Sequence, residues 1–175
     1  MSLDLIQSLI RDVPDFPKPG ILFKDITPVL QSPAGLAAVT TVFVDHWRDA
    51  GIDKIVGIES RGFLLGAPVA VGLGMGLSLV RKAGKLPYER ISRSYDLEYG
   101  SATLEAHVDA ISSGDRVVIV DDLLATGGTA RATVELIREL GGEVVEAAFL
   151  VELGFLAGRE VLGAIDVPTF APIVY

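Results

Sequence analysis

Two adjacent carboxylates come directly before a glycine-rich turn in the segment VVIVDDLLATGGTA, residues 117–130. Asp121 and Asp122 end a run of branched apolar residues, which indicates that they lie where a buried strand ends. The turn after them consists of Ala125, Thr126, Gly127, Gly128 and Thr129. Its backbone N–H groups can converge on an anion, because the helical pattern that follows places the positive end of a helix there.

A ligand that carries both hydroxyls and a phosphate would satisfy the two halves of this segment. Paired carboxylates repel a bare phosphate, but they accept hydrogen bonds from the vicinal hydroxyls of a ribose. The 5-phosphate would then reach the turn, where the two glycines permit close approach and the threonine hydroxyls can donate. The turn is not a Walker A loop, since no lysine follows its glycines. An Asx turn at an ordinary strand end is the structural alternative.

Positive charge is concentrated in one short segment, although the chain carries a formal net charge of -8. Five of its 15 Lys and Arg residues are Arg81, Lys82, Lys85, Arg90 and Arg93. The cluster predicts a clamp for a highly charged anion such as pyrophosphate, and a solvated loop is the alternative. Ser60 and Arg61, between an apolar run and a helical pattern, predict a second helix-terminal anion site. Together these features indicate a phosphate at each end of one ligand.

Short runs rich in Val and Ile alternate with helical patterns along the chain. The predicted strands cover residues 54–58, 77–82, 116–121 and 143–152, and the predicted helices cover 34–50, 63–71 and 129–140. This alternation predicts an α/β fold, with a mostly parallel central sheet flanked by helices, in a single domain over residues 1–175. Ligands of such sheets bind at the carboxyl ends of the strands, where the acidic pair and the turn would lie.

Two regions interrupt the alternation. The first thirty or so residues contain PDFPKPGILFKDITPVL, which is too rich in proline for a layer of the core. Residues 83–103 form a long polar connection with little apolar periodicity. A connection of this length in a compact domain is usually a lid or a binding loop.

The amino-acid composition limits the binding partners and the cellular compartment that we expect for this chain. The chain has no cysteine, which excludes disulfides and thiolate chemistry and leads us to expect a cytoplasmic protein. Its acidic balance argues against nucleic-acid and anionic-membrane partners. Residues 62–80 are uncharged and long enough to span a bilayer, but their five glycines and Pro68 favour a buried helix, a turn and a buried strand.

Five segments resemble, in order and across nearly the whole chain, the adenine phosphoribosyltransferases of the type I phosphoribosyltransferase family. They are FPKPGILFKDITPVL (16–30), ESRGF (59–63), VRKAGKLP (80–87), SYDLEYG (94–100) and VVIVDDLLATGGT (117–129). The acidic pair with its glycine turn is typical of the wider family. Its combination with LEYG and PGILFKDI points to adenine.

The resemblance implies a reaction and an architecture. Adenine and phosphoribosyl pyrophosphate would give AMP and pyrophosphate, with Mg2+ bound to the pyrophosphate and ribose rather than directly to the protein. The sheet would carry a small N-terminal hood over the base, at about residues 1–33, and a mobile active-site loop at about 83–103. The protein would be a homodimer.

The resemblance also implies roles for individual residues. Asp121 and Asp122 would bind the ribose hydroxyls, and residues 125–129 the 5-phosphate. The residues implied around the pyrophosphate are Ser60, Arg61, Arg81, Lys82, Lys85 and Tyr99, with Arg81 able to reach across the dimer. Those implied at the adenine are Leu22 and Arg61, through backbone groups, and Phe23, against its face. Glu98 would be the catalytic group that handles the purine proton.

Two positions depart from the family pattern, and two other functions remain open. Glu59 stands where aspartate is expected, and Arg90 where a small hydroxyl residue is commoner. One alternative is a transferase for guanine, hypoxanthine or xanthine. The other is a non-catalytic regulator that senses phosphoribosyl pyrophosphate and binds DNA, for which the acidic charge and the short segment before the hood motif are unfavourable.

Overall fold

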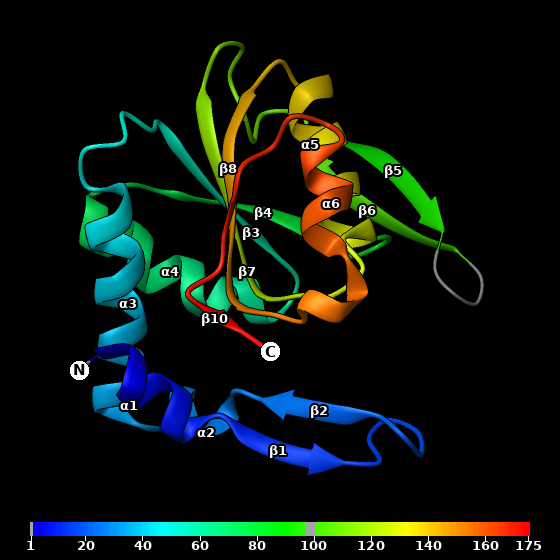
Figure 1. Cartoon of the computed structure of the whole chain (residues 1–175). Coiled ribbons are helices and arrows are strands. Elements are labelled where there is room, and N and C mark those ends of the chain that lie inside the picture. Colours follow the sequence, from blue (N-terminus) through cyan, green and yellow to red (C-terminus); the bar gives the residue numbers. More distant parts are fainter. Residues whose placement is uncertain (1, 97–100) are drawn as a thin grey trace.

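The computed structural model describes residues 2–96 and 101–175, in which eight strands form one sheet (Figure 1). These are β3 (Lys54–Ile58), β4 (Leu77–Lys82), β5 (Arg90–Asp96), β6 (Ser101–His107), β7 (Arg116–Leu124), β8 (Glu143–Glu152), β9 (Thr169–Phe170) and β10 (Ile173–Val174). The order is β10-β8-β7-β3-β4-β6-β5, with β9 also paired to β8. The strands from β10 to β4 are parallel, and β6 and β5 are antiparallel, which confirms the predicted mostly parallel α/β sheet.

Helices cover both faces of this sheet, as Figure 1 shows. Helices α3 (Pro33–Trp47) and α4 (Arg61–Leu73) pack on one face, and α5 (Gly128–Glu139) and α6 (Gly158–Gly163) on the other. Along β7, Val117 and Ile119 contribute to the core under α5, whereas Val118 and Val120 contribute to the core under α3 and α4. Side chains alternate between the faces of a strand, so burial on both faces explains the continuous apolar run.

The predicted elements agree with the structure except at their ends. Helix α3 begins at Pro33, where the Ser32 hydroxyl accepts a hydrogen bond from the Gly35 N–H at 3.0 Å, and it ends three residues before the predicted position. Strand β7 continues past the predicted end at Asp121, because Leu123 and Leu124 still pair with β8. The uncharged stretch 62–80 forms α4, a turn and β4, as expected. Among the described helices, none has the length and apolarity needed to cross a membrane.

The N-terminal region forms a separate small unit. It consists of α1 (Ser2–Leu9), β1 (Arg11–Pro14), β2 (Leu22–Asp25) and α2 (Thr27–Gln31), with β1 and β2 paired antiparallel apart from the main sheet. Ile6 and Val29 anchor it in the core shared with Val39 and Phe43 of α3. Figure 1 shows the unit, in blue, beyond the end of the sheet at which β10 finishes. We call these residues, 2–31, the hood.

Residues 83–103, predicted as one long polar connection, instead include strand β5 and the start of β6. Strands β5 and β6 pair in register from Arg90 with His107 to Asp96 with Ser101. Ile91, Arg93 and Tyr95 are half-buried, while Ser92 and Ser94 between them are exposed. The strand thus alternates with a period of two, but an arginine occupies its packed face, so apolar periodicity does not show it.

Candidate active site

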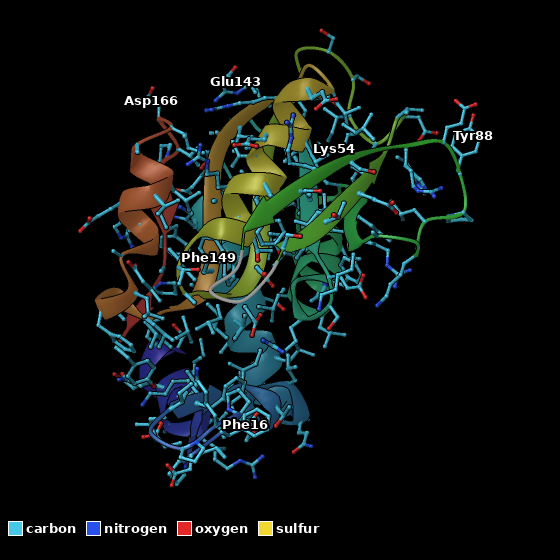
Figure 2. The ribbon with its side chains drawn as sticks, turned by 90° about the vertical axis from the view of Figure 1, so that its right-hand side faces the viewer. Phe16, Lys54, Tyr88, Glu143, Phe149 and Asp166 are labelled. Atoms are coloured by element: carbon cyan, nitrogen blue, oxygen red, sulfur yellow. The ribbon has the colours of Figure 1, made fainter. Side chains whose placement is uncertain are left out.

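A cavity of about 550 Å³ lies at the carboxyl ends of β3, β4 and β7. Figure 2 shows Lys54 and Glu143, at the starts of β3 and β8, at the opposite end of the molecule from Phe16 of the hood. The parallel strands therefore run toward the hood. Phe149 of β8 is one of the residues that line the cavity. The predicted residues that line it are Ser60, Arg61, Lys82, Lys85, Asp121, Asp122, Ala125, Thr126, Gly127, Gly128 and Thr129. Groups predicted to hold opposite ends of one ligand thus share one cavity.

The glycine turn is shaped by close contact with Gly158, the first residue of α6. Gly127 has a φ of +82°, and a Cβ added there would lie 2.9 Å from the Gly158 carbonyl oxygen. Gly158 is equally confined, because its own Cβ would lie 2.2 Å from the Ala125 carbonyl oxygen. Two backbones therefore touch without side chains between them, which fixes the path of the turn. Helix α5 begins at once, and its first N–H groups have no partner within the helix.

If the turn binds the 5-phosphate, as the resemblance implies, Gly127→Ala should raise the KM for phosphoribosyl pyrophosphate by at least about tenfold, the worth of one charge-assisted hydrogen bond to phosphate. The added Cβ must displace the Gly158 carbonyl or the turn itself. Gly74→Ala is the matched control, since Gly74 also has a positive φ, +69°, but no atom within 4 Å of an added Cβ. Steady-state kinetics on both variants check this. Equal KM values for the two variants would show that the shape of the turn does not matter.

The acidic pair is joined to Arg61 by the packing of α4 on β7. A Cβ on Gly62 would lie 2.5 Å from the Val120 carbonyl oxygen, so only glycine lets the helix start so close to the strand. Arg61 Nε then donates to Oδ2 of the buried Asp122 at 2.5 Å. The Asp122 N–H donates to Asp121 Oδ1 at 2.9 Å.

The two aspartates differ in their electrostatic state. Burial, together with the negative charge of Asp122, raises the pKa of Asp121 well above its ordinary value. Burial opposes the charge of Arg61, but Asp122, Asp121 and the more distant Asp25 raise its pKa. The influence of Asp25, the last residue of β2, shows that the hood contributes to the electrostatic environment of Arg61.

Glu59 organises the basic side of the cavity. Its carboxylate accepts hydrogen bonds from Lys85 Nζ at 2.5 Å, the Lys82 N–H at 3.0 Å and Arg81 Nε at 3.3 Å. Arg81 also donates to the Lys85 carbonyl oxygen at 3.1 Å and does not line the cavity. The departure from the family pattern at Glu59 therefore places a long carboxylate against the cations predicted for pyrophosphate.

The pKa of Glu59 predicts a specific loss of stability in acid. Burial would raise this pKa, but the hydrogen bonds from Lys85, Lys82 and Arg81 lower it from 4.5 to about 2. A carboxyl group whose pKa is lower in the folded protein than in the unfolded chain stabilises the fold at pH values above its unfolded pKa. For Glu59 this contribution is lost as the pH falls toward 2. We expect it to be about 1 kcal/mol, since Lys85 is partly solvated.

Denaturant unfolding of the wild type and of Glu59→Gln between pH 5.5 and 2.5 measures this contribution. The free energy of unfolding should fall more steeply for the wild type, because the amide does not titrate. Glu160→Gln, at an exposed glutamate of α6, is the control and should follow the wild type. Parallel pH profiles for wild type and Glu59→Gln would contradict the assignment.

Two members of the predicted basic clamp serve the hairpin instead. Arg90 Nε pairs with the buried Glu105 at 3.1 Å, and Glu105 also accepts from the Gly84 N–H at 3.0 Å. Arg93 Nη2 pairs with Glu139 of α5 at 2.5 Å. Carboxylates on neighbouring elements thus engage Arg90 and Arg93, and neither is among the residues that line the cavity. Lys82 and Lys85 line the cavity.

The residues predicted for the base lie in the hood, apart from Arg61. Leu22 of β2 is 48% exposed, and Phe23 packs edge-to-face on Phe16 with a centroid distance of 5.2 Å. Neither of these two lines the cavity. Glu98 and Tyr99 lie outside the described residues.

Sequence reasoning missed several residues that line the cavity, among them the aromatic residues Tyr95 and Phe149. The hydroxyl of Tyr95 lies 3.0 Å from Thr129 Oγ1. The motif SYDLEYG contains this tyrosine, so the motif was the available signal. Phe149 sits in the apolar run AAFLV of β8, residues 147–151, where nothing in the sequence separates it from core residues.

Known proteins resemble this chain in sequence and in structure over nearly its whole length. Residues 25–165 match the model of the phosphoribosyl transferase domain. An adenine phosphoribosyltransferase of Sodalis glossinidius is 54% identical over 173 residues, covering 99% of this chain and 94% of that protein. The adenine phosphoribosyltransferase structure from Thermoanaerobacter pseudethanolicus has a TM-score of 0.94 and 48% identity, covering 99% of each chain. That from Saccharomyces cerevisiae, complexed with an imino-altritol bisphosphate and adenine, has a TM-score of 0.92 and 41% identity, covering 97% of each chain. This chain belongs to the adenine phosphoribosyltransferase family.

Proposed function

We propose that the protein transfers the 5-phosphoribosyl group of phosphoribosyl pyrophosphate to adenine, giving AMP and pyrophosphate in purine salvage. The observation that carries the proposal is the shared cavity, which is lined by the turn 125–129, by the acidic pair and by Lys82 with Lys85. A sugar with a phosphate at one end and a pyrophosphate at the other matches this set of groups. The related yeast structure holds adenine together with a bisphosphate.

The proposed reaction needs charge stabilisation more than a protein nucleophile. Breaking the bond from C1 of the ribose to pyrophosphate leaves positive charge on the sugar and negative charge on the departing group. Lys82 and Lys85 stabilise the second charge, while N9 of adenine attacks C1 directly. Asp121 and Asp122 hold the sugar hydroxyls, so that C1 stays oriented toward the base.

Mg2+ belongs to this proposal as a companion of the substrate. We propose that the ion is bound by pyrophosphate and ribose oxygens rather than directly by protein ligands. The carboxylates of Asp121 and Asp122 are compatible with it, because Mg2+ prefers oxygen donors and the acids face the same cavity as Lys82 and Lys85. When bound, the ion neutralises charge on the pyrophosphate.

Further roles rest on the family motifs. Glu98 handles the purine proton, and Tyr99 helps to close the site over the pyrophosphate. Leu22 and Phe23 of the hood, together with the Arg61 backbone, recognise the adenine. The proposed location is the cytoplasm, where a phosphorylated sugar substrate would be available.

We also propose that the protein is a homodimer joined through α4 and β4. Leu64, Val71 and Leu79 on these elements are 52%, 81% and 37% exposed, an apolar surface suited to a second copy of the chain. Arg81 is near the end of β4 and outside the cavity of its own chain, which is compatible with the reach across the dimer that the family resemblance implies. Sedimentation should give twice the chain mass of 18.5 kDa for the wild type and a monomer for Val71→Glu. A monomeric wild type would end this part of the proposal.

A product assay with each purine base tests the proposed activity. The purified protein receives phosphoribosyl pyrophosphate, Mg2+ and adenine, guanine, hypoxanthine or xanthine in turn. AMP should be the preferred product by kcat/KM. Preference for another base would reassign the specificity, and tight substrate binding without any nucleotide product would favour the regulator.

A further inference from the structure

Tyr95 connects the β5–β6 hairpin to the turn assigned to the 5-phosphate. Its hydroxyl lies 3.0 Å from Thr129 Oγ1, and both residues line the cavity. Within α5, the Thr129 carbonyl oxygen accepts a hydrogen bond from the Thr133 hydroxyl at 2.9 Å. The contact therefore joins a rigid helix start to a strand that is 34 residues away in sequence.

Strand β5 is attached along the whole length of α5, and Tyr95 is the attachment nearest the cavity. Ile91 and Tyr95 pack against the core cluster that contains Val134 and Ile137 of α5. Arg93, between them, pairs with Glu139 near the far end of the helix. The strand thus has little freedom to slide along α5, and the Tyr95 hydroxyl is brought to Thr129 by packing.

The chemistry of the two hydroxyls indicates which one donates the hydrogen bond and which one accepts it. A threonine hydroxyl has one proton to donate and can accept a hydrogen bond at the same time. If Thr129 donates its proton to a phosphate oxygen, the tyrosine can donate to Thr129 Oγ1. A fully ionised phosphate only accepts hydrogen bonds, so it favours donation from Tyr95 to Thr129 and from Thr129 to the phosphate. In such a chain each hydroxyl polarises the next.

We propose that Tyr95 is a positioning residue for the 5-phosphate, acting through Thr129. Its hydroxyl orients the Thr129 hydroxyl toward the phosphate and keeps the turn and the hairpin in register. This inference rests on the proposed function, because it requires residues 125–129 to bind the phosphate.

The test is a double-mutant cycle between Tyr95→Phe and Thr129→Val. Tyr95→Phe should raise the KM for phosphoribosyl pyrophosphate about three- to tenfold, the worth of one neutral hydrogen bond, and leave kcat and the KM for adenine within twofold of wild type. In the Thr129→Val background the same change should have no further effect. Calorimetric titration with ribose 5-phosphate should show the same pattern in Kd, independently of turnover.

Ser94→Ala is the matched control within the same strand. It removes a hydroxyl contact of similar length, from Ser94 to Thr103 across the hairpin at 2.9 Å, without touching the turn. Its KM and Kd should equal those of the wild type. The proposal is overturned if Tyr95→Phe changes neither KM nor Kd, if its effect persists in Thr129→Val, or if Ser94→Ala has the same effect. A wild type that binds ribose 5-phosphate but makes no AMP would instead refute the proposed function alone.

Discussion

Replacing Glu98 with glutamine should lower kcat by about 10²–10⁴-fold, the usual worth of a positioned acid–base group. The amide keeps the size of the side chain but cannot take the purine proton. The KM for phosphoribosyl pyrophosphate should change little, because that substrate is held by the turn, the acidic pair and the lysines. Steady-state kinetics at saturating Mg2+ measures both quantities.

The flanking strands support this assignment, although Glu98 lies outside the described residues. Tyr95 of β5 and Ala102 of β6 both line the cavity, so the connection that carries Glu98 begins and ends beside the site. Glu89→Gln is the control, since Glu89 is an exposed glutamate just before β5. Its kcat should equal that of the wild type. Near-normal turnover of Glu98→Gln would remove Glu98 from the mechanism.

Converting both aspartates to asparagine should weaken binding of phosphoribosyl pyrophosphate by about 100-fold or more. Each carboxylate is assigned a ribose hydroxyl, and hydrogen bonds to charged groups contribute about 1.5–3 kcal/mol each. Titration calorimetry on Asp121→Asn with Asp122→Asn measures the loss. Unchanged affinity would show that the sugar hydroxyls bind elsewhere.

The single variants separate binding from folding. Asp122→Asn removes the charge that partners Arg61, so it should cost stability as well as affinity. Asp121 differs, because its pKa is raised by folding. The native state then holds the proton more tightly than the unfolded chain, so stability falls as the pH rises through the ordinary aspartate range toward the raised value. Asp121→Asn should therefore increase the free energy of unfolding at pH 7 while it weakens the ligand, and an unstable variant would contradict this.

The sheet and the phosphate turn could be predicted because their signals are local. Branched apolar runs identified β3, β4, β7 and β8, and the spacing of aspartates, glycines and threonines identified the turn. In a parallel sheet the carboxyl ends of strands meet at one edge, so the convergence of Ser60, Arg61, Asp121 and Asp122 followed from topology.

The remaining features depend on partners that are distant in sequence. Arg90 and Arg93 resembled pyrophosphate ligands until Glu105 and Glu139 were placed beside them. Strand β5 was missed because α5, and not an apolar pattern, supplies partners for its packed face. The role of Gly158 could not be foreseen either, since it depends on a close approach to Ala125.

The most direct test of this account is a crystal structure of the protein with AMP. The central claim is that one ribose 5-phosphate is held by its two ends, the phosphate by residues 125–129 and the hydroxyls by Asp121 and Asp122. The AMP phosphate should accept hydrogen bonds from the backbone N–H groups of that turn, with the ribose hydroxyls on the two carboxylates. A phosphate bound instead at Lys82 and Lys85, with the turn empty, would contradict it.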